Sequence, residues 1–106
     1  MALAEEKSQS VEKGSRPLTK REAETLERDV PSWSLVDSRL EEEFQFKDFQ
    51  EAMGFVERVA KIAQEEDHHP DIEVSYNKVR LVLTTHKIGG LSRNDFIVAA
   101  KIERLL

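Results

Sequence analysis

The feature that most constrains the fold of this chain is one long amphipathic stretch between residues 48 and 66. Its apolar residues fill all seven positions of an i, i+3, i+4 ladder, which places them on one side of a helix. Asp48 can cap such a helix, with Glu51 three residues further on. The stretch therefore predicts a helix over about residues 48–66 whose apolar side packs against another layer. The ladder consists of Phe49, Ala52, Met53, Val56, Val59, Ala60 and Ala63.

Shorter helix and strand patterns flank this stretch on both sides. Thr19 and Glu22 have the spacing of a capping box, and Pro31 should prevent the helix that begins there from continuing. Ser92, with Asp95 three residues later, begins a last helix. The resulting α-β-β-α-β-β-α order favours an α+β fold, a four-stranded antiparallel sheet with three helices on one face. The expected elements are a helix over 19–28, strands over 33–36 and 40–46, the helix over 48–66, strands over 72–76 and 79–83, and a last helix reaching residue 105.

Composition excludes several classes of protein. The chain has 106 residues, which suits one domain, and no apolar run approaches the length of a membrane-spanning helix. A net charge of −5 argues against a protein that binds nucleic acid through phosphate contacts. The absence of cysteine rules out disulfides and cysteine-ligated metals. Residues 1–17 are polar and aperiodic, so we expect a disordered tail there and a single domain over residues 18–106. The N-terminus has no secretory or transit pattern, and we expect a cytoplasmic protein.

The second predicted hairpin brings two distant histidines together. If its turn is at residues 77–78, Tyr76 pairs with Val79, and the three pairs in which both members are apolar fall on one face of the hairpin. A slip of one residue would exchange the two faces. Continuing this register places His86 opposite His69, with Cβ atoms about 4.5–5.5 Å apart if the ladder reaches that far.

The third histidine lies beside this pair. Pro70 disfavours helical geometry at His69, so the preceding helix should end near Asp67 and His68 should lie at its exit. Imidazoles gathered around a small molecule suit paired acid and base catalysis, such as removal of a hydroxyl and a neighbouring proton. Three histidines could also bind zinc, although adjacent histidines rarely reach one ion and no fourth ligand is obvious. His69 and His86 could equally cap strand ends at the surface.

Several segments of the chain, which include the three histidines, resemble the sequence motif of the pterin-4a-carbinolamine dehydratase family. The similarity covers about Leu18 to the C-terminus and includes the stretch from Phe44 to Phe49. One position departs from the family pattern, because Gln64 stands where the family has an acidic residue three positions before His-His-Pro. The matching segments are Asp67-His68-His69-Pro70, Tyr76-Asn77-Lys78-Val79, Thr85-His86, and Gly90-Leu91-Ser92 with Asp95.

The resemblance implies dehydration of 4a-hydroxytetrahydropterin to quinonoid dihydropterin, without a metal or redox cofactor, in the recycling of the pterin used by aromatic amino acid hydroxylases. It implies that His68 and His86 form the proton-transfer pair. His69 would mainly hold the pterin, next to Asp67 and Pro70 in the same motif. It also implies a homodimer or homotetramer with a pterin substrate. From its charge and hydropathy we expect no nucleic-acid or membrane partner. The alternative is a non-enzymatic dimerisation or assembly partner that presents the helix over 48–66 or the last helix to another protein.

Other noted positions have structural explanations as well. Asp95 stabilises the start of the last helix as the third residue after the Ser92 cap, and we expect it to support the site only indirectly. Tyr76 falls on the apolar face of the hairpin, so its ring is expected in the core and its hydroxyl at an edge. Trp33 is expected to serve packing. The acidic runs 41–43 and 65–67 are expected to be solvated, the second adding negative potential near His68.

Overall fold

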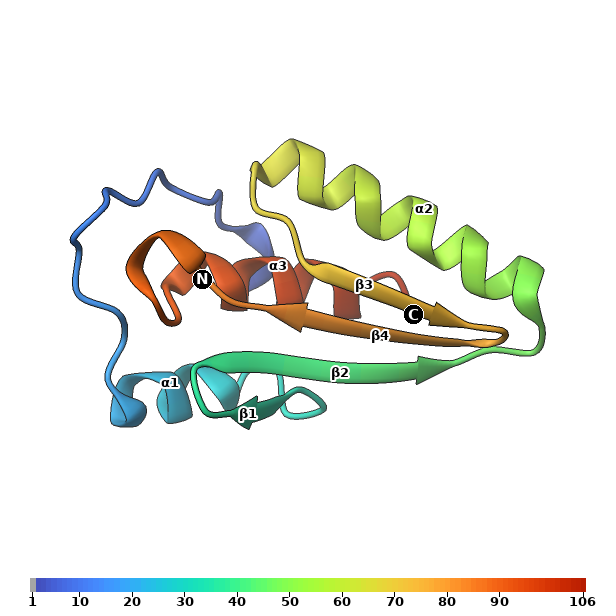
Figure 1. Ribbon diagram of the computed structural model, residues 1–106, viewed down its shortest axis with the longest axis horizontal. Helices are drawn as coiled ribbons and strands as arrows, with labels where there is room; N and C mark the ends of the chain where they lie inside the picture. Colours follow the sequence, from blue (N-terminus) through green and yellow to red (C-terminus); the bar gives the residue numbers. More distant parts are fainter. Residues whose placement is uncertain (1) are drawn as a thin grey trace.

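A computed structural model describes residues 2–106 and shows one antiparallel sheet covered by helices (Figure 1). The strands lie in the order β1-β2-β4-β3, so the two hairpins meet through β2 and β4. Both the α+β class and the α-β-β-α-β-β-α order are confirmed. The elements are the 3-10 helix η1 (Leu3–Glu5), α1 (Lys20–Glu27), β1 (Ser34–Val36), β2 (Arg39–Gln45), α2 (Phe49–Glu66), β3 (Asp71–Ser75), β4 (Lys78–Leu83), the 3-10 helix η2 (His86–Ile88) and α3 (Arg93–Glu103).

The helices begin where the sequence places their caps. Thr19 and Glu22 form a reciprocal capping box at the start of α1. Asp48 accepts a hydrogen bond from the Glu51 backbone N–H (2.9 Å) at the start of α2. These bonds satisfy backbone donors that the first turn of a helix leaves free. Within residues 2–106, no helix is both long and apolar enough to span a bilayer.

The core lies between the inner face of the sheet and the helices. Phe55 of α2 contacts Phe44 and Phe46, with ring centroids 4.8 and 4.9 Å apart. Trp33 is 1% exposed and meets Phe44 edge to face, so the predicted packing role is confirmed. Phe96 of α3 is fully buried as well. The apolar side of α2 therefore covers the sheet, as the ladder predicts.

The predicted register of the second hairpin is wrong by two residues. Val74 faces Val79 instead of Leu81, and Ser75 faces Lys78. The turn is consequently Tyr76-Asn77, with Tyr76 in the left-handed region at φ 51°. A shift of two keeps every side chain on its predicted face, so alternation alone cannot distinguish the two registers.

A contact outside the hairpin explains this register. The Asn77 side chain donates to the Phe46 carbonyl (2.8 Å), and the Phe46 N–H donates to the Asn77 carbonyl (2.8 Å). These two bonds attach Asn77 to the connection between β2 and α2. Tyr76 is therefore pushed to the tip of the turn, where it is 66% exposed, and its predicted place in the core is wrong.

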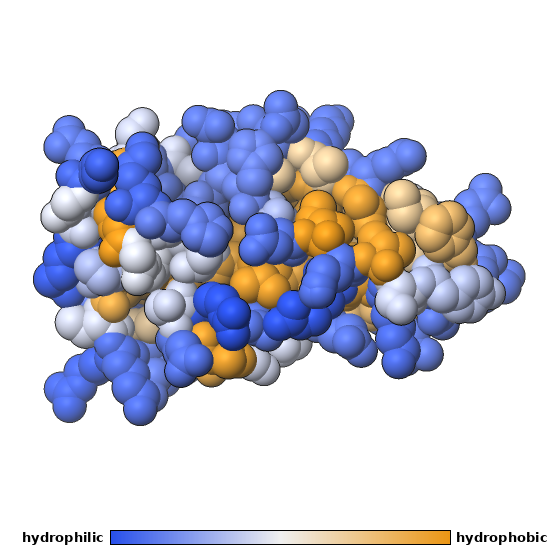
Figure 2. All heavy atoms as spheres, viewed as in Figure 1, coloured by the Kyte–Doolittle hydropathy of each residue, from blue (hydrophilic) through white to orange (hydrophobic). Residues whose placement is uncertain are grey.

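The edge strand β3 leaves apolar side chains at the surface. Ile72 is 36% exposed and Val74 is 37% exposed. Figure 2 shows apolar surface gathered in the region of β3 and α2, bordered by polar side chains. β3 is an edge strand, so it also carries backbone groups that no neighbouring strand pairs.

Glu42 does not belong to a solvated acidic face. Along β2 it points to the same side as the buried Leu40 and Phe44, because alternate residues of a strand share a face. Burial and the neighbouring Glu103 carboxylate raise the pKa of Glu42 to about 8. Its buried Oε2 has no hydrogen-bond partner among residues 2–106. A proton retained on Glu42 can supply a donor between the two carboxyl groups.

Replacement of Glu42 by glutamine should flatten the dependence of stability on pH. In the unfolded chain Glu42 has the ordinary glutamate pKa of 4.5, whereas its pKa in the folded chain is raised to about 8. The folded state thus binds more protons in that window, and the free energy of unfolding falls as pH rises through it. We expect E42Q to unfold at a higher temperature than the parent chain at pH 8.5, by roughly 4–8 °C for a gain of about 1 kcal/mol, and by less at pH 5.

The control for this change is Glu43→Gln on the exposed face of the same strand. Thermal unfolding followed by circular dichroism from pH 5 to pH 8.5 measures both variants. An E42Q variant with the same pH dependence as the parent chain would contradict a shared proton between Glu42 and Glu103.

The N-terminal segment differs from the expected disordered tail. Leu3 is 4% exposed in the hydrophobic core, and η1 packs against α3. In Figure 1 the chain then passes the loop before α3 on its way to α1. The sequence pattern gives no hint of this, since the segment has no apolar period and is held mainly by polar contacts to α2 and α3. Met1 of the predicted tail lies outside the described residues.

Candidate functional site

The end of α2 positions the first two histidines. Asp67 caps the helix in the left-handed conformation (φ 51°), and the His68 N–H donates back to the Ala63 carbonyl (3.1 Å). This arrangement satisfies the last carbonyls of the helix and turns the chain sharply. His68 and His69 leave at that turn, as predicted, and Pro70 is buried immediately before β3 begins.

The third histidine reaches the same place by a route that differs from the prediction. β4 ends at Leu83, and a bridge between Thr85 and Gly90 then closes a short loop containing η2. His86 begins η2, so the predicted strand pairing of His69 with His86 is wrong. The loop nevertheless returns His86 to the end of α2. All three histidines line one polar pocket of about 330 Å³, together with Gln9, Ser10, Val11, Asp67, Thr84, Thr85, Lys87 and Asn94.

A buried carboxylate holds His68. The His68 Nε2 lies 2.5 Å from Asp95 Oδ1, and the side chain of Asp95 is fully buried. Its other oxygen accepts from the Thr85 hydroxyl (2.8 Å) and the Ser92 N–H (2.9 Å). Because a carboxylate only accepts hydrogen bonds, the proton of this contact is on Nε2, and Nδ1 of a neutral His68 is an acceptor. Asp95 thus contacts the histidine directly, in addition to its predicted role at the start of α3.

Gln64 takes part in the site although it is not acidic. Its side-chain oxygen lies 2.6 Å from Nε2 of His69. An amide oxygen accepts a hydrogen bond as a carboxylate does, without the negative charge. Gln64 therefore offers His69 an acceptor without the negative charge that an acidic residue would bring. Both groups are exposed, in contrast to the buried pair of His68 and Asp95.

Some predicted site residues lie elsewhere. Tyr76 is at the hairpin turn, at the opposite end of β3 from His69. Pro70 is buried and does not line the pocket, whereas Asp67 does. The sequence interpretation missed Asn94 and the three N-terminal residues of the pocket. The position of Asn94 next to Asp95 was an available signal, but the N-terminal residues carried none.

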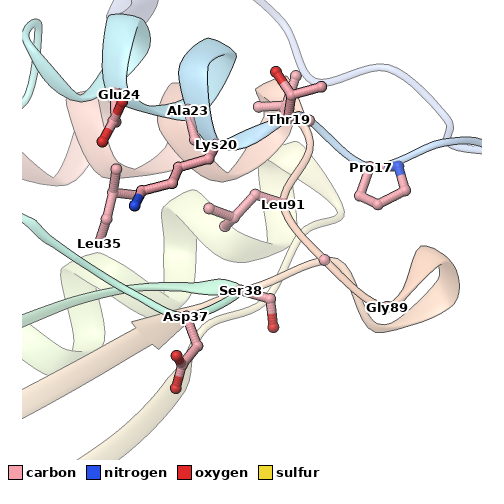
Figure 3. A pocket seen from close by; sticks show the side chains of 12 residues that line it. Pro17, Thr19, Lys20, Ala23, Glu24, Leu35, Asp37, Ser38, Gly89 and Leu91 are labelled. Atoms are coloured by element: carbon pink, nitrogen blue, oxygen red, sulfur yellow. The ribbon is translucent and has the colours of Figure 1, made fainter.

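Two further features help to assign chemistry to this pocket. Within residues 2–106, histidine and acidic side chains form no group of three that could hold a metal ion. A larger cavity of about 490 Å³ lies between α1, the β1–β2 turn and the loop before α3 (Figure 3). Its charged lining residues are Lys20, Glu24 and Asp37, and no histidine is among them. The smaller pocket is thus the one with side chains suited to proton transfer near neutral pH.

Comparison with known proteins gives consistent matches. The family model described as Pterin 4 alpha carbinolamine dehydratase matches residues 16–105. A protein of Nitrosomonas eutropha named as a pterin-4-alpha-carbinolamine dehydratase is 49% identical over 98% of this chain and 93% of its own length. A protein of the same name from Rubrobacter xylanophilus is 42% identical over 97% of both chains. A crystal structure from Brucella melitensis, described as a transcriptional coactivator/pterin dehydratase, superposes with a TM-score of 0.80 and 34% identity, covering 85% of this chain and 98% of that one.

Proposed function

Since the chain belongs to the pterin-4a-carbinolamine dehydratase family, we propose that it removes water from a 4a-hydroxytetrahydropterin through the histidines of its polar pocket. The family makes the chain a hydro-lyase. The observation that carries the histidine mechanism is the convergence of His68, His69 and His86 on one pocket, with His68 bound to a buried carboxylate. The reaction serves to recycle the tetrahydropterin used by aromatic amino acid hydroxylases.

The proton on His68 Nε2 determines which role this residue takes. Its Nδ1 is the acceptor nitrogen, so His68 is the base that takes the proton from N5 of the pterin. The electron pair of that N–H bond becomes the second bond between N5 and C4a. The resulting imidazolium is stabilised by Asp95 at 2.5 Å.

His86 completes the elimination as the acid. It is exposed at the start of η2, where it can exchange protons with solvent. It protonates the 4a-hydroxyl as the C4a–O bond breaks, and water leaves. His69, bound by Gln64, holds the pterin, and Asp67 lines the pocket beside it.

The purified chain should accelerate the decay of chemically prepared 4a-hydroxytetrahydropterin. Acid–base catalysis by positioned side chains contributes about 10²–10⁴-fold to such a step. Loss of the carbinolamine, followed by its ultraviolet absorbance, measures the rate against buffer and against the same amount of heat-denatured protein. A decay rate equal to that of the denatured control would contradict the proposal.

The alternative is an assembly role, which the description of the Brucella melitensis protein as a coactivator favours. Most of α3 is buried, so it cannot present the apolar stripe that we considered for a partner. On α2, Phe49 stays 51% exposed and is the available apolar contact. A stoichiometric partner in pull-down experiments, together with absent dehydratase activity, would favour this role. The homodimer or homotetramer and the cytoplasmic location stay predictions.

A further inference from the structure

Part of the N-terminal segment lines the histidine pocket, although it lies outside the matched family region, which begins at residue 16. We propose that residues 9–11 form a substrate-contacting wall of this pocket and set its affinity for the pterin. This inference rests on the proposed dehydratase function and concerns the same site. We call residues 2–11 the strap.

Ionic and apolar contacts hold the first part of the strap against α3. Leu3 is buried in the core. Glu6 receives two hydrogen bonds from the Arg93 guanidinium, at 2.8 and 2.7 Å. Two parallel bonds of this kind fix orientation as well as distance. The strap therefore has a defined path along the start of α3.

The end of α2 holds the next part of the strap. The Ser8 N–H donates to Glu66 Oε1 (2.8 Å), and Glu66 Oε2 lies 3.6 Å from Lys7 Nζ and 3.5 Å from Lys101 Nζ. Burial raises the pKa of Glu66, but the Ser8 N–H and the two lysines outweigh this and lower it overall. The prediction that Glu66 is solvated is thus wrong, since its side chain is 6% exposed and accepts a hydrogen bond from the strap.

Asn94 places the last part of the strap at the pocket. It accepts from the Gln9 N–H (3.0 Å) and donates to the Gln9 carbonyl (2.6 Å). Asn94 is itself buried and directly precedes Asp95, the carboxylate that holds His68. The strap is consequently positioned by the same turn of α3 that positions the base.

The anchored residue and the two that follow it can contact a polar ring. Gln9, Ser10 and Val11 line the pocket with the histidines. Among residues 2–106, the peptide groups of Ser10 and Val11 have no backbone or side-chain hydrogen-bond partner. The amide and amino groups of a pterin ring need both donors and acceptors, which peptide groups supply.

The test is Gln9→Pro in the full chain. Proline removes the N–H that Asn94 accepts, and Gln9 itself is exposed outside the core. We expect KM to rise about five- to tenfold, the equivalent of roughly one hydrogen bond. The kcat should change by less than about twofold, because the histidines keep their own partners. The dissociation constant of a stable dihydropterin analogue should rise by the same factor as KM.

Lys13→Pro is the matched control. Lys13 is the second residue of a turn closed by the Ser15 N–H and the Glu12 carbonyl (3.1 Å), followed by Gly14 at φ 92°. Proline suits that turn position, and Lys13 does not line the pocket. This variant should match the parent chain in KM and in analogue binding.

A second measurement needs no variant. Saturating dihydropterin analogue should slow hydrogen exchange at the Ser10 and Val11 amides of the parent chain, but not at residues 12–14. Unchanged exchange at Ser10 and Val11, or a Gln9→Pro variant with parental KM and analogue affinity, would overturn the proposed substrate contact of residues 9–11. Neither result would contradict the proposed dehydratase function. A parent chain that neither dehydrates the carbinolamine nor binds the analogue would instead overturn the proposed function.

Discussion

Simultaneous replacement of His68 and His86 by alanine is expected to remove nearly all acceleration of carbinolamine decay, lowering kcat by about 10³-fold or more. The two imidazole rings line the same pocket but come from different elements, His68 from the end of α2 and His86 from η2. If they act as base and acid in one elimination, each single variant should already lose most of the activity. The double variant should then lose less than the product of the two single losses, because groups that act as a unit are not additive.

Imidazole rescue separates this result from a structural effect. Deleting a ring leaves space in a pocket open to solvent, and added imidazole can take over proton transfer there. We expect partial recovery of kcat for the single variants, increasing with imidazole concentration, and similar unfolding temperatures for His86→Ala and the parent chain. Unchanged turnover in the double variant would end the histidine mechanism.

The helices were predictable from the sequence because their signals are local. The capping pairs and the ladder in α2 involve residues within one or two turns of each other, and the structure reproduces both ends of α2 within a residue. The order of helices and strands along the chain followed from the same local patterns. Fold class needs no more than this, since hairpins separated by helices leave few ways to cover one sheet face.

The register and the strap were not predictable because both depend on distant contacts. Asn77 is hydrogen-bonded to Phe46, 31 residues away in the chain. This contact places the turn at residues 76–77 instead of 77–78, which shifts the strand pairing by two residues. Gln9 is attached to Asn94, 85 residues away. Neither contact leaves a period or a motif in the sequence. The prediction that the histidines converge is correct in outcome, although the strand pairing on which it relied is wrong.

Replacement of Asp95 by asparagine is expected to impair both stability and catalysis. The fully buried carboxylate makes hydrogen bonds to three groups, His68, Thr85 and Ser92. Asparagine has a single acceptor oxygen, so it cannot accept from all three. We expect a loss of about 1–2 kcal/mol in the free energy of unfolding, since hydrogen bonds to a charged carboxylate are replaced by weaker ones to a neutral amide.

The effect on catalysis follows from the tautomer of His68. The amide group of asparagine presents a donor where the carboxylate accepted, so Nε2 would become the acceptor and Nδ1 would carry the proton. His68 would then be unable to take the N5 proton at Nδ1, and we expect kcat to fall about 10²-fold. The binding of a dihydropterin analogue should change little, because Asp95 does not line the pocket.

Ser92→Ala is the matched control for the expected losses of stability and of kcat in D95N. It removes the hydroxyl that lies 2.8 Å from the Thr85 hydroxyl, but it keeps the backbone N–H that Asp95 accepts. Loss of this hydroxyl contact should cost about 1 kcal/mol in the free energy of unfolding, while kcat is retained. Chemical denaturation and steady-state kinetics of the two variants separate the contributions. If D95N and Ser92→Ala lost stability equally and both kept kcat, Asp95 would be a structural cap and the orientation of His68 would not limit the reaction.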